Sequence, residues 1–361
     1  MPELIDAATF PTTRYQGSKR KILDWFLEVF NELEFDSVLD AFGGTSSVSY
    51  LFKRMGKSVV YNDYLKFNHL VGKALIENQG ILINDDDIEF ILDFSQINNE
   101  NSFIQDNFKD VYYTDEENEW LDNIVSRIND FQGNNNNETE VKKAMFFYAL
   151  FQSCLRKRPF NLFHRKNLYI RTNDVKRNFG NKTTWEKDFT SELKYFLNEL
   201  NKSIFNSETN CVALNENVMQ LENNNYDLVY FDPPYVSGSG NTETNNYLKC
   251  YHFLEGLTDY DNWSNRIDFA TKNLRFKKED NPFNQNNILN SLALLFENFQ
   301  DSIIVLSYKI GGTPTIDEIV ELMCNFKTNV EVKSKHYVYA LNKQNGNAKH
   351  NREVLIIGKN D

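Results

Sequence analysis

The sequence carries its most specific chemical pattern at Asp232, Pro233, Pro234 and Tyr235. The apolar run at residues 227–231 predicts a strand that ends at the acid, and the two prolines stiffen the next loop and remove two N–H donors. Carbonyl and carboxylate oxygens then converge as acceptors beside a flat aromatic ring. Such a site suits an amine attached to an aromatic ring, because acceptors on its two hydrogens free a nitrogen lone pair that is otherwise delocalised. The structural alternative is a strand that ends in a proline-stiffened turn.

A second pattern lies near the N-terminus, where an apolar run ends in Asp40 and is followed by Phe42, Gly43 and Gly44. Glycines at a strand-to-helix turn let a ligand approach the backbone, and a helix N-terminus favours polar or anionic groups. About 20 residues later Asp63 ends the next apolar run, where a carboxylate can accept hydrogen bonds from two ribose hydroxyls. The pair suits a cofactor that contains adenosine, although a glycine turn followed by a helix-capping acid gives the same pattern.

Together these motifs resemble the DNA adenine-N6 methyltransferases that use S-adenosylmethionine, in the group whose cofactor motif precedes the catalytic motif. The resemblance covers residues 14–67 and 211–358 well and the middle of the chain weakly. It implies catalysis by Asp232, Pro233, Pro234 and Tyr235, with adenine rotated out of the duplex and methylated directly. It also implies a set of cofactor-binding residues: Tyr15, Lys19, Asp40, Phe42, Gly44, Asp63, Asn217 and Asp232.

Two positions depart from the family pattern. The glycine turn usually has a further glycine where this chain has Ser46, which we expect to be tolerated as a helix cap. An aspartate that faces the cofactor's adenine often precedes the catalytic strand, and the nearest match here is Asn217. An amide oxygen can still accept a hydrogen bond from an amino group, so the sequence remains compatible with cofactor binding.

These residues need a fold that brings distant segments together. Apolar runs that end in acids alternate with stretches of helical spacing, which predicts an α/β fold with a doubly wound, mostly parallel sheet. The runs at residues 336–340 and 353–358 predict a C-terminal antiparallel hairpin. The overall prediction is a class I methyltransferase-like domain formed by residues 1–70 and 206–361. Residues 71–205 are predicted to form a mainly helical insert that recognises the target.

Charge is distributed unevenly along the chain, whose formal net charge is −12. Residues 84–122 contain 13 acidic residues and one lysine, whereas residues 154–187 contain ten basic residues and two acidic ones. Basic residues interleaved with aromatic ones suit DNA contact, and we expect six of them to bind DNA: Arg156, Lys157, Arg158, Arg165, Lys166 and Arg171. The alternative is a basic loop that offsets the acidic segment.

Two other classes of function stay open. One is another amino methyltransferase, acting on cytosine N4, on RNA or on a glutamine amide, although an acid at position 232 favours adenine. The other is a DNA-binding module without catalysis, which has no need of the whole set of motifs.

The remaining features concern the cell and the partners. Four cysteines without a CxxC pair predict reduced thiols in a cytoplasmic protein. The acidic N-terminus lacks the features of a signal peptide, and no apolar run approaches the length of about 20 residues that a membrane helix needs. Five histidines without metal-binding spacing predict no metal site. The resemblance implies double-stranded DNA as partner, together with a cognate restriction endonuclease that acts on the same site without direct contact. A solitary or phage-encoded methylase would have the same features.

Overall fold

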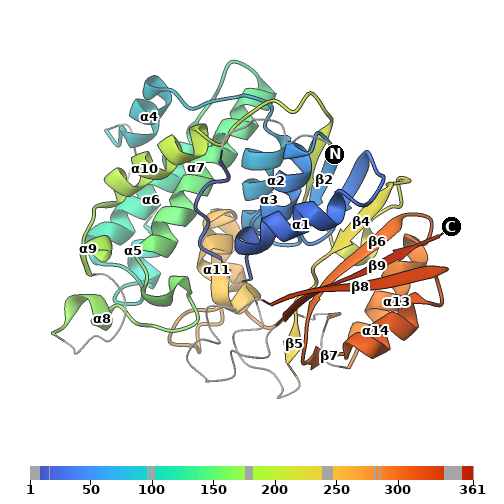
Figure 1. Ribbon diagram of the computed structural model, residues 1–361. Helices are drawn as coiled ribbons and strands as arrows, with labels where there is room; N and C mark the ends of the chain where they lie inside the picture. The colour runs from blue at the N-terminus through green and yellow to red at the C-terminus, as the bar shows by residue number, and fades with distance from the viewer. Residues whose placement is uncertain are drawn as a thin grey trace.

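A computed structural model describes residues 9–15, 17–95, 97, 102–174, 182–237, 247–279, 282–283, 286–336 and 352–360 (Figure 1). The second strand of the predicted hairpin lies within these ranges, and most of the first, at residues 337–340, lies outside them. No helix among the described residues is long and apolar enough to cross a membrane.

A seven-stranded sheet forms the centre of the protein, with the strand order β3-β2-β1-β4-β6-β9-β8. Its strands are β1 (Ser37–Asp40), β2 (Ser58–Asn62), β3 (Cys211–Leu214), β4 (Leu228–Phe231), β6 (Ile303–Lys309), β8 (Asn329–His336) and β9 (Arg352–Lys359). The first five are mutually parallel, and β9 runs antiparallel to both of its neighbours. The predicted doubly wound α/β fold with a C-terminal antiparallel hairpin is therefore confirmed. A separate two-stranded sheet pairs β5 (Val236–Ser237) with β7 (Gly312–Thr313).

The first strand of the hairpin begins earlier in the sequence than predicted, and residues 337–340 of the predicted range lie outside the described residues. The structure places this strand, β8, at Asn329–His336, upstream of the predicted residues 336–340. Most side chains of β8 are polar or charged and exposed, as expected for a strand at the edge of a sheet. Its sequence therefore lacks the apolar run that made residues 353–358 recognisable.

Helices cover both faces of the sheet because neighbouring strand residues point to opposite sides. Leu39, Val229 and Phe231 pack with α13 (Ile288–Asn298) and α14 (Ile316–Met323), whereas the alternate strand residues face the other helical layer. That layer includes η1 (Arg20–Ile22), α1 (Leu23–Phe30), α2 (Ser47–Arg54), α3 (Lys66–Gly72), η2 (Lys73–Glu77) and α11 (Tyr247–Leu257). The remaining short elements after β3 are η4 (Val218–Gln220), η6 (Tyr260–Asn262) and α12 (Trp263–Arg266).

A group of helices lies between β2 and β3 in the sequence and fills the left side of Figure 1. It consists of α4 (Asp85–Leu92), α5 (Phe103–Asn107), α6 (Asp115–Asp130), α7 (Asn136–Arg156), η3 (Pro159–Asn161), α8 (Tyr169–Thr172), α9 (Lys182–Trp185) and α10 (Phe189–Asn201). Helix α7 is buried along nearly its whole length from Val141 to Leu155 and packs on both α3 and α10. The apolar core of this group is continuous with the core on the face of the sheet that α1, α2 and α3 cover.

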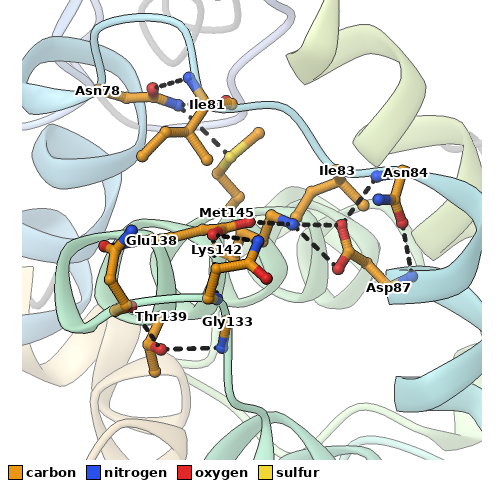
Figure 2. Close-up of polar contacts among 12 residues, drawn as sticks. Asn78, Ile81, Ile83, Asn84, Asp87, Gly133, Glu138, Thr139, Lys142 and Met145 are labelled. Carbon is orange, nitrogen blue, oxygen red and sulfur yellow. Dashed lines mark hydrogen bonds and ion pairs between the residues drawn. The ribbon is translucent and has the colours of Figure 1, made fainter.

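A buried lysine joins two of these helices (Figure 2). The ammonium of Lys142 on α7 lies 2.8 Å from Asp87 on α4 and 2.7 Å from Glu138 one turn earlier. Asp87 also accepts a hydrogen bond from the backbone N–H of Asn84, so this carboxylate caps α4 while it binds α7. The contact neutralises acidic residues that the sequence concentrates in this region.

We expect Lys142→Met to lower the free energy of unfolding by about 2–4 kcal/mol, because removing one partner of a buried ion pair leaves uncompensated carboxylates. Urea unfolding monitored by circular dichroism measures the change. The control is Lys143→Met, which removes a neighbouring lysine that donates to the carbonyl of Asn129 at an exposed site. An equal loss in both variants would show that the Lys142 ion pairs have no special role.

Candidate active site

A cavity of about 340 Å³ opens at the carboxyl ends of the parallel strands. It lies beside the junction of β1 and β4, where the direction of the strand order reverses, which is the usual ligand site of doubly wound sheets. Four predicted residues line it from the ends of four strands: Asp40 from β1, Asp63 after β2, Asn217 after β3 and Asp232 after β4. The fold thus brings together residues that are almost 200 positions apart in the sequence.

The two glycines of the turn between β1 and α2 are restricted in different ways. A Cβ atom on Gly43 would lie 2.0 Å from the ring of Tyr61, and Gly44 has a φ of +50°. Ser46 has a φ of 63° and sits at the N-cap position of α2 without a side-chain capping hydrogen bond. Ser46 therefore occupies the expected cap position, but its hydroxyl makes no capping hydrogen bond. Its left-handed backbone is a conformation that glycine adopts without steric cost.

Asp63 connects the glycine turn to β2. Its two carboxylate oxygens accept hydrogen bonds from the backbone N–H groups of Gly44 and Leu65, each at 2.9 Å. Burial nevertheless raises the pKa of Asp63 to about 6. The carboxylate is held at the cavity wall with a fixed orientation.

Asp40 lies deeper in the same wall. One oxygen of its carboxylate accepts a hydrogen bond from the hydroxyl of Ser49 at 2.5 Å. Burial raises the pKa of Asp40 to about 7, and the nearby charges of Asp232 and Asp63 act in the same direction. Three carboxylates whose negative charges disfavour one another therefore surround one cavity. A ligand that carries positive charge would relieve this repulsion.

The other predicted cofactor residues also line the cavity. The ring of Tyr15 stacks on Tyr251 and Tyr247, at centroid distances of 4.7 and 5.5 Å. Phe42 packs edge-to-face on Phe283 at 5.1 Å. These rings add an apolar surface to the acidic wall, as expected for a site that holds a heterocycle.

Asn217 lines the cavity at the start of η4. Its side-chain oxygen accepts a hydrogen bond from the backbone N–H of Met219 at 3.1 Å. The amide is thereby oriented by the backbone, and its role toward a ligand stays a prediction.

The acid of the catalytic motif is part of a polar cluster. The ammonium of Lys19 lies 3.1 Å from Asp232 and 2.9 Å from Glu353, a residue of β9. The hydroxyl of Tyr235 lies 2.8 Å from each of these carboxylates and accepts a hydrogen bond from Lys19. Burial raises the pKa of Asp232 to about 6, while the charge of Lys19 lowers it and that of Glu353 raises it. Lys19 is therefore placed beside Asp232 in the cavity wall, as predicted, and its role toward a cofactor stays a prediction.

The prolines of the motif form the link between β4 and β5. Pro233 is buried, and Pro234 lines the cavity. Neither residue has an N–H group, so the backbone here presents carbonyl acceptors.

The sequence analysis missed Glu353 and the basic rim of the cavity. In the sequence, Glu353 is a charged residue at the start of an otherwise apolar run. This pattern alone predicts only that the end of the strand is exposed. The cavity is also lined by Arg275, Lys277 and Lys278 from a segment that precedes α13. This short basic stretch carries no motif.

The six predicted DNA-binding residues fall into two groups. Lys157 and Arg158 are 2% and 1% exposed, so the expectation that they contact DNA is corrected by their burial. Lys157 pairs with Glu117 at 2.8 Å and donates to the carbonyls of Trp185 and Lys187. Arg158 donates to the carbonyl of Leu162. Their charges are used to hold the helical region together.

Of the other four predicted residues, two form internal ion pairs and two are exposed. Arg156 lies 3.0 Å from Glu192, and Arg171 binds Glu117 through two nitrogens at 2.7 and 2.9 Å. By contrast, Arg165 and Lys166 are exposed. Lys157 and Arg171 both pair with Glu117 of the acidic segment, so the alternative, in which the basic segment offsets the acidic one, is correct for these two of the six residues.

Comparison with known proteins gives a consistent result. The family model described as D12 class N6 adenine-specific DNA methyltransferase matches residues 15–262. The Type II methyltransferase M2.HphI of Haemophilus parahaemolyticus is 25% identical over 355 residues, which cover 96% of this chain and 98% of that protein. The Type II methyltransferase M.FokI of Planomicrobium okeanokoites is 25% identical over 270 residues, which cover 69% of this chain and 37% of that protein.

The elevated pKa of Asp40 predicts a specific pH dependence of stability. The folded state binds a proton that the unfolded state has lost between about pH 4 and pH 7, so this group's stabilising contribution declines as the pH rises through that range. We expect Asp40→Asn to gain about 1–3 kcal/mol of unfolding free energy relative to the wild type when the pH is raised from 5 to 8.

Urea unfolding at the two pH values measures this difference, in which the titration of all other groups largely cancels. The matched control is Asp36→Asn, because the side chain of Asp36 is fully exposed. A constant difference between Asp40→Asn and the wild type at both pH values would contradict the burial argument.

Proposed function

The chain belongs to the D12 class N6 adenine-specific DNA methyltransferase family, and from this premise we propose how its residues perform the reaction. The protein is an adenine-specific DNA methyltransferase, and DNA is its substrate. Family membership implies S-adenosylmethionine as the methyl donor. The observation that supports our assignment of the site most directly is the single cavity wall that contains both the ribose-binding acid Asp63 and the catalytic acid Asp232.

The chemistry of the cavity fits this cofactor. Its sulfonium and amino groups are cationic, and the acidic wall formed by Asp40, Asp63 and Asp232 favours positive charge. We propose that Asp63 accepts hydrogen bonds from the ribose hydroxyls, with Tyr15 and Phe42 along the apolar parts and Gly44 allowing close approach. When bound, the cofactor supplies an electrophilic methyl group.

The catalytic motif provides the acceptors for the amino group of adenine. We propose that Asp232 and the carbonyl of Pro233 accept its two hydrogens, while Pro234 and Tyr235 shape the slot. When both amino hydrogens are hydrogen-bonded to these acceptors, the nitrogen lone pair moves out of conjugation with the ring, so the nitrogen becomes nucleophilic. Asp232 acts chiefly as an orienting acceptor, because the amine becomes acidic only after methylation and can lose its proton then.

The position of the cavity requires adenine to leave the duplex. Its walls lie at the end of a buried sheet, and an amino group within stacked bases cannot approach them. We propose that the basic residues at the cavity rim, Arg275, Lys277 and Lys278, contact the phosphates that flank the rotated nucleotide. Arg165 and Lys166 extend this contact as exposed cations of the helical region, and residues 71–205 form the target-recognition region.

The two named relatives support a biological role. Both are called Type II methyltransferases, and one of them aligns with nearly the whole of this chain. We propose that this protein is the modification enzyme of a type II restriction-modification system, acting on double-stranded DNA. A cognate endonuclease would then recognise the same sequence independently.

We expect Asp232→Ala to abolish methylation, with a loss of at least about a thousandfold in turnover, because the amine loses its orienting acceptor. DNA incubated with labelled S-adenosylmethionine and digested to nucleosides gives the readout as N6-methyladenine. Circular dichroism and binding of S-adenosylhomocysteine control for the fold and the pocket. Undiminished labelling by the variant would overturn this mechanism, and N4-methylcytosine from the wild type would overturn the assignment of the base.

We expect the double substitution Arg165→Ala, Lys166→Ala to weaken DNA binding about three- to thirtyfold at physiological salt and to reduce the salt dependence of binding, because phosphate contacts release counterions. Fluorescence anisotropy over a range of salt concentrations measures both quantities. Lys157→Ala is the comparison, since its buried ammonium pairs with Glu117 and its loss should lower thermal stability instead. An unchanged salt dependence in the double variant would remove these two residues from the DNA-binding surface.

A further inference from the structure

Glu353 is a buried carboxylate beside the catalytic acid, and the mechanism above gives it no role. It lies at the start of β9 and is 0% exposed. Its carboxylate lies 2.9 Å from the ammonium of Lys19, 2.8 Å from the hydroxyl of Tyr235 and 2.5 Å from the hydroxyl of Ser307. A buried carboxylate is costly to maintain, so its contacts indicate a specific purpose.

The cluster contains two carboxylates and one ammonium. Lys19 lies between Asp232 and Glu353 and contacts both. With both acids ionised the three groups carry a net charge of −1, whereas Lys19 and Asp232 alone would form a neutral pair. Further titratable groups face this cluster from the surrounding elements: Asp40, Tyr230, Tyr235, Tyr247 and Lys309.

Tyr235 couples the two acids. Its hydroxyl has one hydrogen, and it lies at the same distance, 2.8 Å, from Asp232 and from Glu353. Glu353 therefore competes for the same donor and the same ammonium as the catalytic acid. A carboxylate offers about four acceptor sites, so sharing these donors leaves capacity on Asp232 for an incoming amino group.

We propose that Glu353 is a positioning residue that divides Lys19 between two carboxylates and thereby adds a negative charge beside the reaction site of Asp232. This inference rests on the proposed function of Asp232. The negative cluster favours the sulfonium of the methyl donor over the neutral thioether of the product. It also keeps Asp232 a strong acceptor for the amino hydrogens of adenine.

The discriminating variant is Glu353→Gln, which keeps the size of the side chain and an acceptor oxygen for Tyr235 and Ser307. The control is Glu331→Gln, which removes an exposed carboxylate from the neighbouring strand β8. Calorimetry on the full-length protein without DNA measures the affinities for S-adenosylmethionine and S-adenosylhomocysteine. We expect Glu353→Gln to weaken binding of the cationic ligand about three- to tenfold and to change binding of the neutral one less than about twofold.

Turnover gives a second readout. Removing the charge of Glu353 lowers the pKa of Asp232, because that charge now raises it. We therefore expect the acidic limb of the kcat profile to move to lower pH in Glu353→Gln, with a lower plateau and an unchanged KM for DNA. Glu331→Gln should match the wild type in every measurement.

Each alternative outcome has a defined meaning. Equal losses of affinity for the two ligands, or an unmoved acidic limb, would show that Glu353 only supports the local structure and would overturn the proposal. If Glu353→Gln does not fold, the variant Lys19→Met, which retains Glu353, tests the same proposal. Removing the shared ammonium should raise the affinity for the cationic ligand relative to the neutral one, and a falling ratio would overturn the proposal. If the wild type forms no N6-methyladenine, the proposed function is overturned instead. The two failures can be told apart because the affinities for the two ligands are measured without DNA.

Discussion

The burial of carboxylates at the carboxyl ends of parallel strands is the constraint on which the rest of the site depends. A carboxylate withdrawn from water is unfavourable unless donors or cations replace the lost hydration. Asp40 obtains a donor from Ser49, and Asp63 obtains donors from the backbone N–H groups of Gly44 and Leu65. Asp232 depends on Lys19, which lies more than 200 residues earlier. The part of the acidic wall that Asp232 contributes therefore depends on docking of the N-terminal segment against the end of β4.

The reversed direction of β9 completes this arrangement. It lies between β6 and β8 and pairs antiparallel to both, so its first residues lie at the end of the sheet where the parallel strands terminate. Glu353 pairs in register with Lys309, and its carboxylate reaches Ser307 diagonally across the strand pair. If β9 ran parallel to β6, its last residues would lie at this end of the sheet in place of its first residues. The antiparallel hairpin thus has a chemical consequence as well as a topological one, because it brings a carboxylate from near the end of the chain to Lys19.

Local patterns in the sequence predicted those parts of the structure that local chemistry determines. Apolar runs that end in acids identified β1, β2 and β4, and the proline pair identified the loop after β4, because each pattern reflects burial or backbone geometry within a few residues. The edge strand β8 escaped detection because its side chains are mostly polar. Glu353 escaped because its partners are remote in sequence. The assignment of Lys157 and Arg158 to DNA failed because a count of charges along the chain does not reveal which charges pair inside the fold.

Those internal pairs change what the net charge of −12 means for a protein that acts on DNA. The acidic segment does not simply repel DNA, since Asp87 and Glu117 are bound to lysines and an arginine within the helical region. Internal contacts likewise withdraw Arg156, Lys157, Arg158 and Arg171 of the basic segment from the surface. Exposed charges act on DNA only within about one Debye length, roughly 8 Å at physiological salt. The charges available for contact with DNA are therefore those that the fold leaves exposed, such as Arg165 and Lys166, and the sign of the total charge does not show where they lie.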